Sequence, residues 1–265
     1  MSLGLHTNTC SHVRRTERLQ SRGRFLGDWS NGDDAGLQNP RLGFDSLVPR
    51  LIRAVIFDLD GLLVDSASAW DRGRKELVAE HGLEWPDGAT EAMLGMSAPE
   101  WSAYVNEQLG VPLEPPVISE RVVAHMLATY ERHLPLLPGA EDAVARMAER
   151  WPLGLASSSN KEVIDRVMLT SGWGEVFHTW VSSEEVARGK PAPDVFLEAA
   201  RRLGVDPAGA AGIEDSHNGI LAARAAGLRV IAVPNREFPP GEDALAAADV
   251  VLDSLNELSS DVVAG

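Results

Sequence analysis

The chain contains a single cysteine, Cys10, among its 265 residues. One cysteine excludes an internal disulfide and a metal site built from several thiolates, and it fits a reducing compartment. No stretch approaches the roughly 18 consecutive apolar residues that a membrane-spanning helix needs. We therefore expect a cytoplasmic protein with no membrane partner.

Basic residues are also scarce. Only three residues are lysine, and 39 acidic against 24 basic side chains give a net charge of −15. Proteins that bind nucleic acids through phosphate contacts normally carry a basic face, so we expect no nucleic-acid partner. Apolar residues make up 44% of the chain and charged residues 24%, which is ordinary for a globular protein and excludes a wholly disordered one.

The first 50 residues differ in composition from the rest. They hold 15 apolar residues, seven arginines and five acidic residues, and turn-forming residues gather in segments such as Ser30–Asp34. No helical or strand period persists there. We expect residues 1–50 to be a disordered extension. An Arg-rich targeting peptide is the alternative, and the acidic residues weigh against it.

An ordered domain is predicted from residue 51 onward. Residues 51–57 form a nearly continuous apolar run, typical of a strand buried on both faces of a parallel sheet. Residues 67–134 have helical periodicity and contain no good strand. After residue 135, short strands alternate with helices, which indicates right-handed crossovers and a parallel sheet. The strands are expected at 153–156, 178–181, 210–213, 230–233 and 250–252.

The predicted fold class is therefore α/β, a Rossmann-like parallel sheet with helices on both faces and an inserted helical cap. Residues 51–66 and 135–265 would form the core domain, and residues 67–134 the cap. We find no internal repeat.

Acidic residues, a serine and a lysine follow the carboxyl ends of the predicted strands. In a parallel sheet the carboxyl ends of the strands lie side by side, so these residues should converge in one crevice. Four carboxylates that close together repel one another unless a cation neutralises them, and oxygen ligands without His or Cys favour Mg²⁺. The converging residues would be Asp58, Asp60, Ser157, Lys190, Glu214 and Asp215.

This set of groups suits phosphoryl transfer. Ser157 at a helix start offers an anion site, and Lys190 adds a positive point charge. Asp58 and Asp60 lie two residues apart and so point to the same side of an extended segment. One can attack phosphorus to form an aspartyl-phosphate while the other handles the proton of the leaving group.

Four segments, in this order, resemble the motifs of the haloacid dehalogenase-like hydrolase superfamily. A lone Asp-x-Asp would be weak evidence, whereas the ordered set is very specific. The resemblance covers about residues 51–258, and the helical insertion is similar to the cap of the β-phosphoglucomutase and sugar-phosphate phosphatase branch. The segments are Phe57–Ser66 (FDLDGLLVDS), Leu155–Asn160 (LASSSN), Gly189–Asp194 (GKPAPD) and Gly212–Gly219 (GIEDSHNG).

The resemblance implies a role for each motif residue. Asp58 would be the nucleophile and a Mg²⁺ ligand. Asp60 would be the general acid and then the base that activates water, with its main-chain carbonyl on the metal. The phosphoryl group would be held by Ser157, Ser158 and Lys190, and the metal site would be completed by Asp215 and by Glu214, directly or through water.

The cap favours hydrolysis over isomerisation. The segment with Trp70 resembles phosphatases of the 2-deoxyglucose-6-phosphate and hexitol type, whereas the mutases usually have a His there. The mutases also carry a Lys and an Arg in a cap loop where this chain has Leu94 and Ala98. We therefore predict a monomeric Mg²⁺-dependent phosphatase that acts on a small sugar or polyol phosphate. A sugar phosphomutase with the same nucleophile is the alternative.

Several further residues are candidates for substrate contact. Trp70, Met96 and Asn160 are predicted to line the substrate pocket, although each could equally be ordinary cap core or a solvated helix start. His217 stands beside the acidic motif, yet hard-ion sites rarely use His, and it is interpreted as a surface residue.

Overall fold

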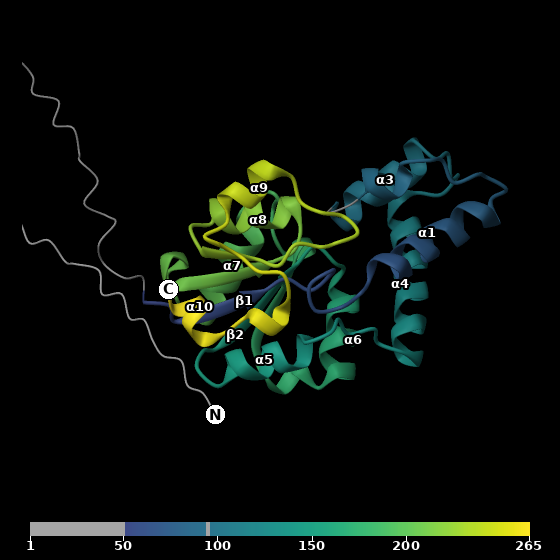
Figure 1. Cartoon of the computed structure of the whole chain (residues 1–265). Helices are drawn as coiled ribbons and strands as arrows, with labels where there is room; N and C mark the ends of the chain where they lie inside the picture. The colour runs from purple at the N-terminus through teal and green to yellow at the C-terminus, as the bar shows by residue number, and fades with distance from the viewer. Residues whose placement is uncertain (1–50, 94–95) are drawn as a thin grey trace, which may run out of the picture. The chain divides into compact units, whose positions relative to one another are not determined.

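The computed structural model describes residues 51–93 and 96–265. The expectations for residues 1–50 and for Leu94 lie outside the described residues. In the described part the chain alternates strands and helices around one sheet of parallel strands (Figure 1). The strands are β1 (Ala54–Phe57), β2 (Leu153–Ser157), β3 (Phe177–Ser182), β4 (Ala210–Glu214), β5 (Arg229–Ala232) and β6 (Val250–Val251).

The strand order is β3-β2-β1-β4-β5-β6, and every pairing is parallel. The first strand in the sequence therefore lies in the middle, with β2 on one side and β4 on the other. The predicted fold class, a Rossmann-like α/β sheet, is confirmed. The strand β3 is longer than predicted, because Phe177 and Ser182 also pair with β2.

Helices cover both faces of the sheet. Side chains alternate along β1, so that Val55 and Phe57 pack into one apolar cluster and Ile56 into another. The first cluster includes residues of α5, α6 and α10, and the second includes residues of α7, α8 and α9. These helices are α5 (Ala140–Ala148), α6 (Lys161–Ser171), α7 (Asp194–Leu203), α8 (His217–Ala225), α9 (Glu242–Ala247) and α10 (Ser260–Ala264).

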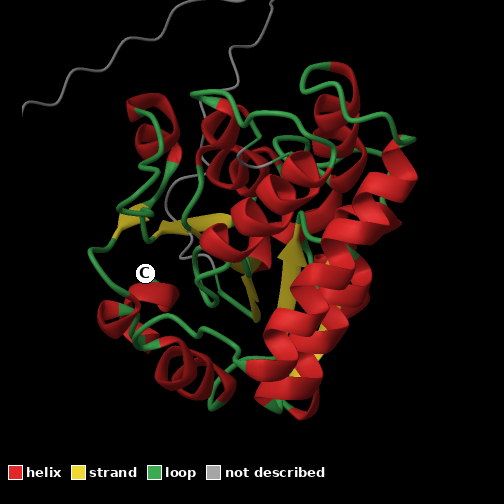
Figure 2. Cartoon of the chain, turned by 90° about the vertical axis from the view of Figure 1, so that its right-hand side faces the viewer, coloured by secondary structure: helices red, strands yellow, loops and turns green. Residues whose placement is uncertain are grey.

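The stretch predicted to be helical, residues 67–134, contains helices and no strand among its described residues. Helix α4 packs against both α1 and α3, and this group faces the viewer in Figure 2. Their apolar stripes predicted from the sequence, including Leu77, Val105 and Met126, are buried. The helices are α1 (Ala67–Glu80), α2 (Ala89–Ala92), α3 (Ala98–Glu107) and α4 (Pro115–Arg132).

The chain enters and leaves this helical group through two segments that lie side by side. The Leu137 amide donates to the Leu63 carbonyl over 3.0 Å, and the Asp65 amide donates to the Pro135 carbonyl over 2.8 Å. This pairing supports a boundary at residues 66 and 135, and we propose that residues 67–134 form a cap on the core. No helix among the described residues is both long enough and apolar enough to cross a membrane.

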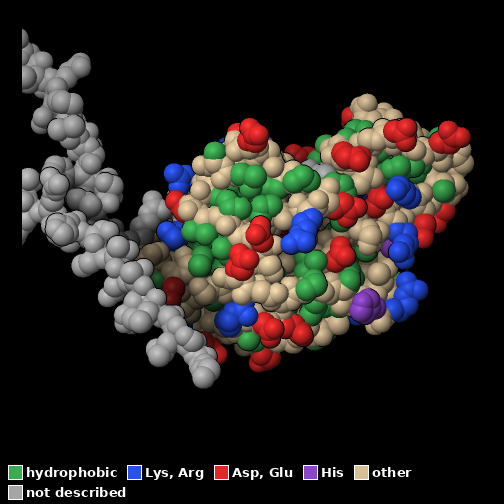
Figure 3. Space-filling model, in the orientation of Figure 1, with side chains coloured by type: hydrophobic (Ala, Val, Ile, Leu, Met, Phe, Trp, Pro, Cys, Tyr) green, Lys and Arg blue, Asp and Glu red, His purple; other side chains and the backbone are tan. Residues whose placement is uncertain are grey.

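Charged side chains are spread over the described surface. On the face drawn in Figure 3, basic and acidic side chains alternate with apolar ones, and the basic ones do not gather in one place.

Candidate active site

Lys190 joins three neighbouring strands at the carboxyl edge of the sheet. Its Nζ donates to Asp58 Oδ1 over 2.5 Å, to the Ala156 carbonyl over 3.0 Å and to Glu214 Oε1 over 2.6 Å. Asp58 directly follows β1, while Ala156 belongs to β2 and Glu214 to β4. The structure therefore brings together residues up to 156 positions apart, as parallel pairing predicts.

Glu214 is fully buried, and hydrogen-bond donors surround its carboxylate. Besides Lys190 on Oε1, the amides of Asp215 and Ser216 donate to Oε2 over 3.0 and 3.1 Å, and the Ser216 hydroxyl donates over 3.1 Å. The carboxylate lies so close to the first turn of α8 that a Cβ on Gly219 would meet Oε1 at 1.8 Å. Only glycine leaves this space.

Three carboxylates lie close enough to hold a metal ion. Asp58, Glu214 and Asp215 each offer an oxygen, and these oxygens lie within 4.8 Å of one another. Asp215 Oδ1 is buried and has no hydrogen-bond partner. Burial raises the pKa of Asp215 well above its usual value, and the neighbouring charges of Glu214 and Asp58 raise it further. An orphaned buried oxygen in an all-oxygen donor set fits a hard cation such as Mg²⁺.

The same environment acts on Asp58. Burial is the largest cause that raises the pKa of its carboxyl, and the Lys190 ammonium opposes that shift. The Asp60 side chain lies outside the group of three carboxylates. The predicted contact of its main-chain carbonyl with a metal stays a prediction.

Asp60 is held by groups from both sides of the site. The hydroxyls of Ser157 and Ser159 donate to its Oδ2 over 3.0 and 2.7 Å, and the indole Nε1 of Trp70 donates to its Oδ1 over 3.3 Å. Ser157 is fully buried and also accepts the Ser159 amide over 2.9 Å. Ser158 and Ser159, rather than Ser157, line the pocket above. The phosphate-binding role of Ser157 and Ser158 stays a prediction.

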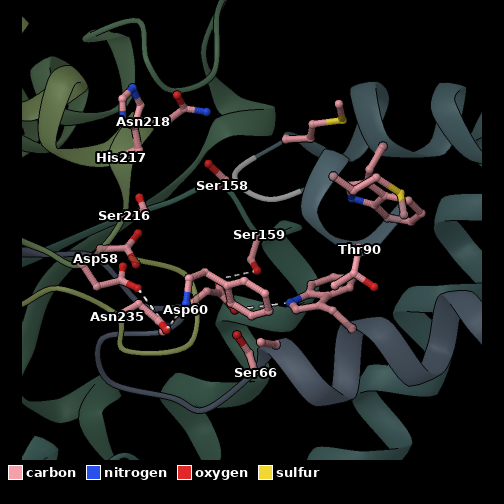
Figure 4. Close-up of a pocket in the computed structure, with 18 of the residues that line it drawn as sticks. Asp58, Asp60, Ser66, Thr90, Ser158, Ser159, Ser216, His217, Asn218 and Asn235 are labelled. Atoms are coloured by element: carbon pink, nitrogen blue, oxygen red, sulfur yellow. Dashed lines mark hydrogen bonds between the residues drawn. The ribbon is translucent and has the colours of Figure 1, made fainter. Parts of the chain in front are cut away.

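These groups open into a cavity of about 500 Å³ between the sheet edge and the helical group. Figure 4 shows Asp58, Ser158, Ser159 and Asn235 on one side of it and Thr90 on the other. The wall formed by the helical group is mainly aromatic and apolar, with Trp70, Met93, Met96 and Trp101. A phosphate held at the sheet edge would therefore point its organic part at this wall.

The structure places all three predicted substrate residues in the lining of the cavity, with one qualification. Trp70 and Met96 line the pocket. Asn160 lines it too, but its amide already donates to Glu184 Oε1 over 2.7 Å and to the Ser119 hydroxyl over 3.2 Å. His217 lies at the surface as interpreted, with 42% of its side chain exposed, and it also lines the pocket.

Asn235 and Arg74 are among the pocket residues that sequence reasoning missed, and a signal existed for both. Asn235 donates to Asp215 Oδ2 over 3.4 Å and follows β5 by three positions, so the strand-end argument applied to β5 would have found it. Arg74 lines the pocket four residues after Trp70 in α1, and that spacing places both on one helix face.

The comparisons with known proteins agree with this geometry. The sequence model of the haloacid dehalogenase-like hydrolase family matches residues 52–227. Hexitol phosphatase B of Escherichia coli strain K12 is 37% identical over 219 residues, which cover 80% of this chain and 96% of that protein. The bifunctional riboflavin kinase/FMN phosphatase of Arabidopsis thaliana is 31% identical over 219 residues, 82% of this chain and 57% of that protein.

Solved structures are similar as well. CbbY from Rhodobacter sphaeroides, in complex with phosphate, superposes with a TM-score of 0.72 at 29% identity, covering 80% of this chain and 99% of that one. A β-phosphoglucomutase from Clostridium difficile gives a TM-score of 0.70 at 27% identity, covering 80% and 96%. The ordered motifs, the parallel sheet and these matches lead to one conclusion: the chain belongs to the haloacid dehalogenase-like hydrolase family.

Proposed function

We propose that this protein is a Mg²⁺-dependent phosphatase that hydrolyses a small phosphorylated sugar or polyol through an aspartyl-phosphate on Asp58. The observation that carries the proposal is the buried junction of Asp58, Lys190 and Asp215 at the floor of a cavity whose opposite wall is aromatic. Several relatives are named as phosphatases, among them hexitol phosphatase B and a probable pseudouridine-5'-phosphatase of Drosophila melanogaster.

In the first step, an Asp58 carboxylate oxygen would form a bond to phosphorus while the bond between phosphorus and the leaving oxygen breaks. Asp60 would donate its proton to that oxygen, and the free alcohol would depart. Lys190 would hold negative charge on the transferring phosphoryl group. The hydroxyls of Ser157 and Ser159 orient the Asp60 carboxylate for this transfer.

In the second step, Asp60, now ionised, would take a proton from water, and the hydroxide would attack phosphorus. The bond to Asp58 breaks, which returns its carboxylate and releases inorganic phosphate. A Mg²⁺ ion held by Asp58 and Asp215, with Glu214 beside them, would supply a positive charge that offsets the charge on the phosphoryl oxygens. The aromatic wall would exclude bulk water while substrate is bound.

The proposal is tested by phosphate release from a panel of sugar and polyol phosphates and from p-nitrophenyl phosphate, with Mg²⁺ and with EDTA. Asp58→Asn should lower kcat by at least about 10³-fold, because it removes the nucleophile. Asp165→Asn is a matched control, since its carboxyl is about half exposed on α6. Full activity of Asp58→Asn, or full activity in EDTA, would contradict the mechanism. Conversion of a sugar 1-phosphate to a 6-phosphate without phosphate release would favour the mutase.

We also propose that the protein works as a cytoplasmic monomer. Every group that the proposed mechanism uses, from Asp58 to Asp215, is supplied within one chain. Light scattering of the purified enzyme at assay concentration should give the mass of one chain, and a stable dimer would contradict this.

A further inference from the structure

The helical group contains a buried cation that the proposed mechanism does not use. Arg74 in α1 is 9% exposed and lines the cavity opposite the sheet edge. Among the described residues it has no ion-pair partner, and its Nε has no hydrogen-bond partner. Asp71 lies one turn before Arg74 in α1. It already forms an ion pair with Lys75 over 2.5 Å and accepts a hydrogen bond from the Thr90 hydroxyl over 2.5 Å.

Two indole rings fix the position of this guanidinium. Its Cζ lies over the ring of Trp70, 5.4 Å from the centroid, and over the ring of Trp101, 5.0 Å from the centroid. The two rings are 6.0 Å apart and tilted by 56°. Such cation–π contacts offset part of the cost of burial. The short distance between the two rings puts both on the same side of the guanidinium, and since Arg74 also lines the cavity, N–H donors on its other side are left to bind a ligand.

Arg74 keeps its charge in this setting. Burial lowers its pKa to about 10, and the charges of Asp71 and Asp60 oppose that shift, so the group is protonated at neutral pH. A buried charge without a partner is costly unless a ligand supplies one. Asp60 does not form an ion pair with Arg74 in the described part of the chain; its carboxylate accepts from Trp70, Ser157 and Ser159.

The cavity thus has two cationic positions on opposite walls. Lys190 stands at the sheet edge beside Asp58, and Arg74 stands in the wall formed by the helical group. The Trp70 indole joins the two walls, since its Nε1 donates to Asp60 over 3.3 Å while Arg74 lies over its ring. A molecule in this cavity therefore meets a cation on each wall.

We propose that Arg74 binds a second anionic group of the substrate, a carboxylate or a second phosphate, at the end remote from the phosphate that is hydrolysed. A planar guanidinium recognises either group with two parallel hydrogen bonds. This inference rests on the proposed function and narrows its substrate class from sugar and polyol monophosphates to those that carry a further acidic group.

The test compares three six-carbon substrates: glucitol 6-phosphate, which has no second charge, 6-phosphogluconate, and fructose 1,6-bisphosphate. The wild type should hydrolyse at least one of the two doubly charged compounds with a kcat/KM about 100-fold above that of glucitol 6-phosphate. Arg74→Met should remove most of that advantage and lower glucitol 6-phosphate hydrolysis far less. A preference for 6-phosphogluconate indicates that Arg74 binds a carboxylate, and a preference for fructose 1,6-bisphosphate indicates that it binds a phosphate. Arg72→Met, an exposed neighbour in the same helix, is the control.

A second readout does not depend on turnover of a doubly charged substrate. Gluconate carries the acidic end without the phosphate, so it should inhibit the wild type competitively and inhibit Arg74→Met about tenfold less. If Arg74→Met does not fold, Arg74→Lys serves, because it keeps the charge and loses the paired donors.

Each outcome bears on one proposal or the other. A wild type without preference among the three substrates, or an equal loss on all three in the Arg74 variants, overturns the role of Arg74 while the phosphatase stands. No phosphate release from any substrate, including p-nitrophenyl phosphate, overturns the proposed function itself.

Discussion

Glu214 contributes to the site mainly through the hydrogen bonds that its carboxylate accepts. Its two oxygens accept four hydrogen bonds, from Lys190, from two main-chain amides and from the Ser216 hydroxyl. Little acceptor capacity is left for a cation. We infer that Asp58 and Asp215 are the direct ligands and that Glu214 fixes Lys190 beside Asp58.

Gly219→Ala tests this arrangement. The added Cβ would lie 1.8 Å from Glu214 Oε1, so the carboxylate has to move and Lys190 loses an anchor. We expect a loss of about 1–3 kcal/mol in the free energy of unfolding, as for overpacked cores, and a fall in kcat of at least about tenfold. Denaturant unfolding and steady-state kinetics measure the two effects.

The control is Gly174→Ala, whose Cβ would meet its nearest neighbour, the Met168 carbonyl oxygen, at an ordinary 3.5 Å. It should leave kcat unchanged. Wild-type activity in Gly219→Ala would show that the position of Glu214 is unimportant for turnover.

At this scale, the sequence predicts residues whose place follows from a strand end. Asp58, Lys190, Glu214 and Asp215 meet as parallel pairing requires. Arg74 was not predicted, because its burial depends on how Trp70 of α1 and Trp101 of α3 pack around it. Helical periodicity shows which residues lie on one face of a helix. It does not show whether a cation on that face becomes buried against another helix.

At the scale of elements, the junction between β4 and α8 connects stability to the site. Ser216 is the N-cap of α8: its hydroxyl accepts the Gly219 amide over 3.1 Å and also donates to Glu214. Ser216→Ala should lower the free energy of unfolding by about 1 kcal/mol, the usual cost of a lost cap, and shift Tm down by about 2–4 °C. It should also lower kcat, since Glu214 loses a donor.

Ser259→Ala is the control that separates the loss of a helix cap from an effect on the site. Ser259 caps α10 by accepting the Val262 amide over 3.3 Å, and it lies in no part of the described cavity. It should cost similar stability by calorimetry and leave kcat unchanged. Equal kinetics for the two variants would mean that the cap of α8 has no bearing on the chemistry.

Elements with a clear period were predicted well, and short polar turns were not. The 3-10 turn Ser183–Glu185 after β3 is not among the elements predicted from the sequence, yet Ser182 and Glu185 cap it reciprocally. Its Glu184 then accepts the Lys161 amide over 2.8 Å at the start of α6. Such turns depend on side-chain hydrogen bonds rather than on apolar spacing, so hydropathy patterns do not reveal them.

For the whole molecule, we predict that residues 51–265 fold and act without the first 50. The hexitol phosphatase B match takes in 96% of that relative with 80% of this chain, and residues 1–50 have few apolar side chains to pack. The shortened chain should keep its Tm within about 2 °C and its kcat/KM within about twofold. Calorimetry and the phosphate-release assay check this. A shortened chain that aggregates or loses activity would assign the first 50 residues a role in the fold or the site.

The helical insertion could be predicted because the alternation of strand and helix stops at residue 67 and resumes after residue 135. The cavity could be predicted only in part, with Trp70, Met96 and Asn160 in its lining. Its walls come from two regions that the sequence separates, and which side chains meet across it depends on how α1 and α3 rest over the sheet edge.

One hydrogen bond joins the helical group to the core at Asp60, the residue proposed to move the proton. Trp70 in α1 donates to the same Asp60 carboxylate that Ser157 and Ser159 hold from the core. Any movement of α1 away from β1 must break this bond. The orientation of the proposed general acid therefore depends on the position of the helical group, and Asp60 is held by all three donors only while that group lies against the core.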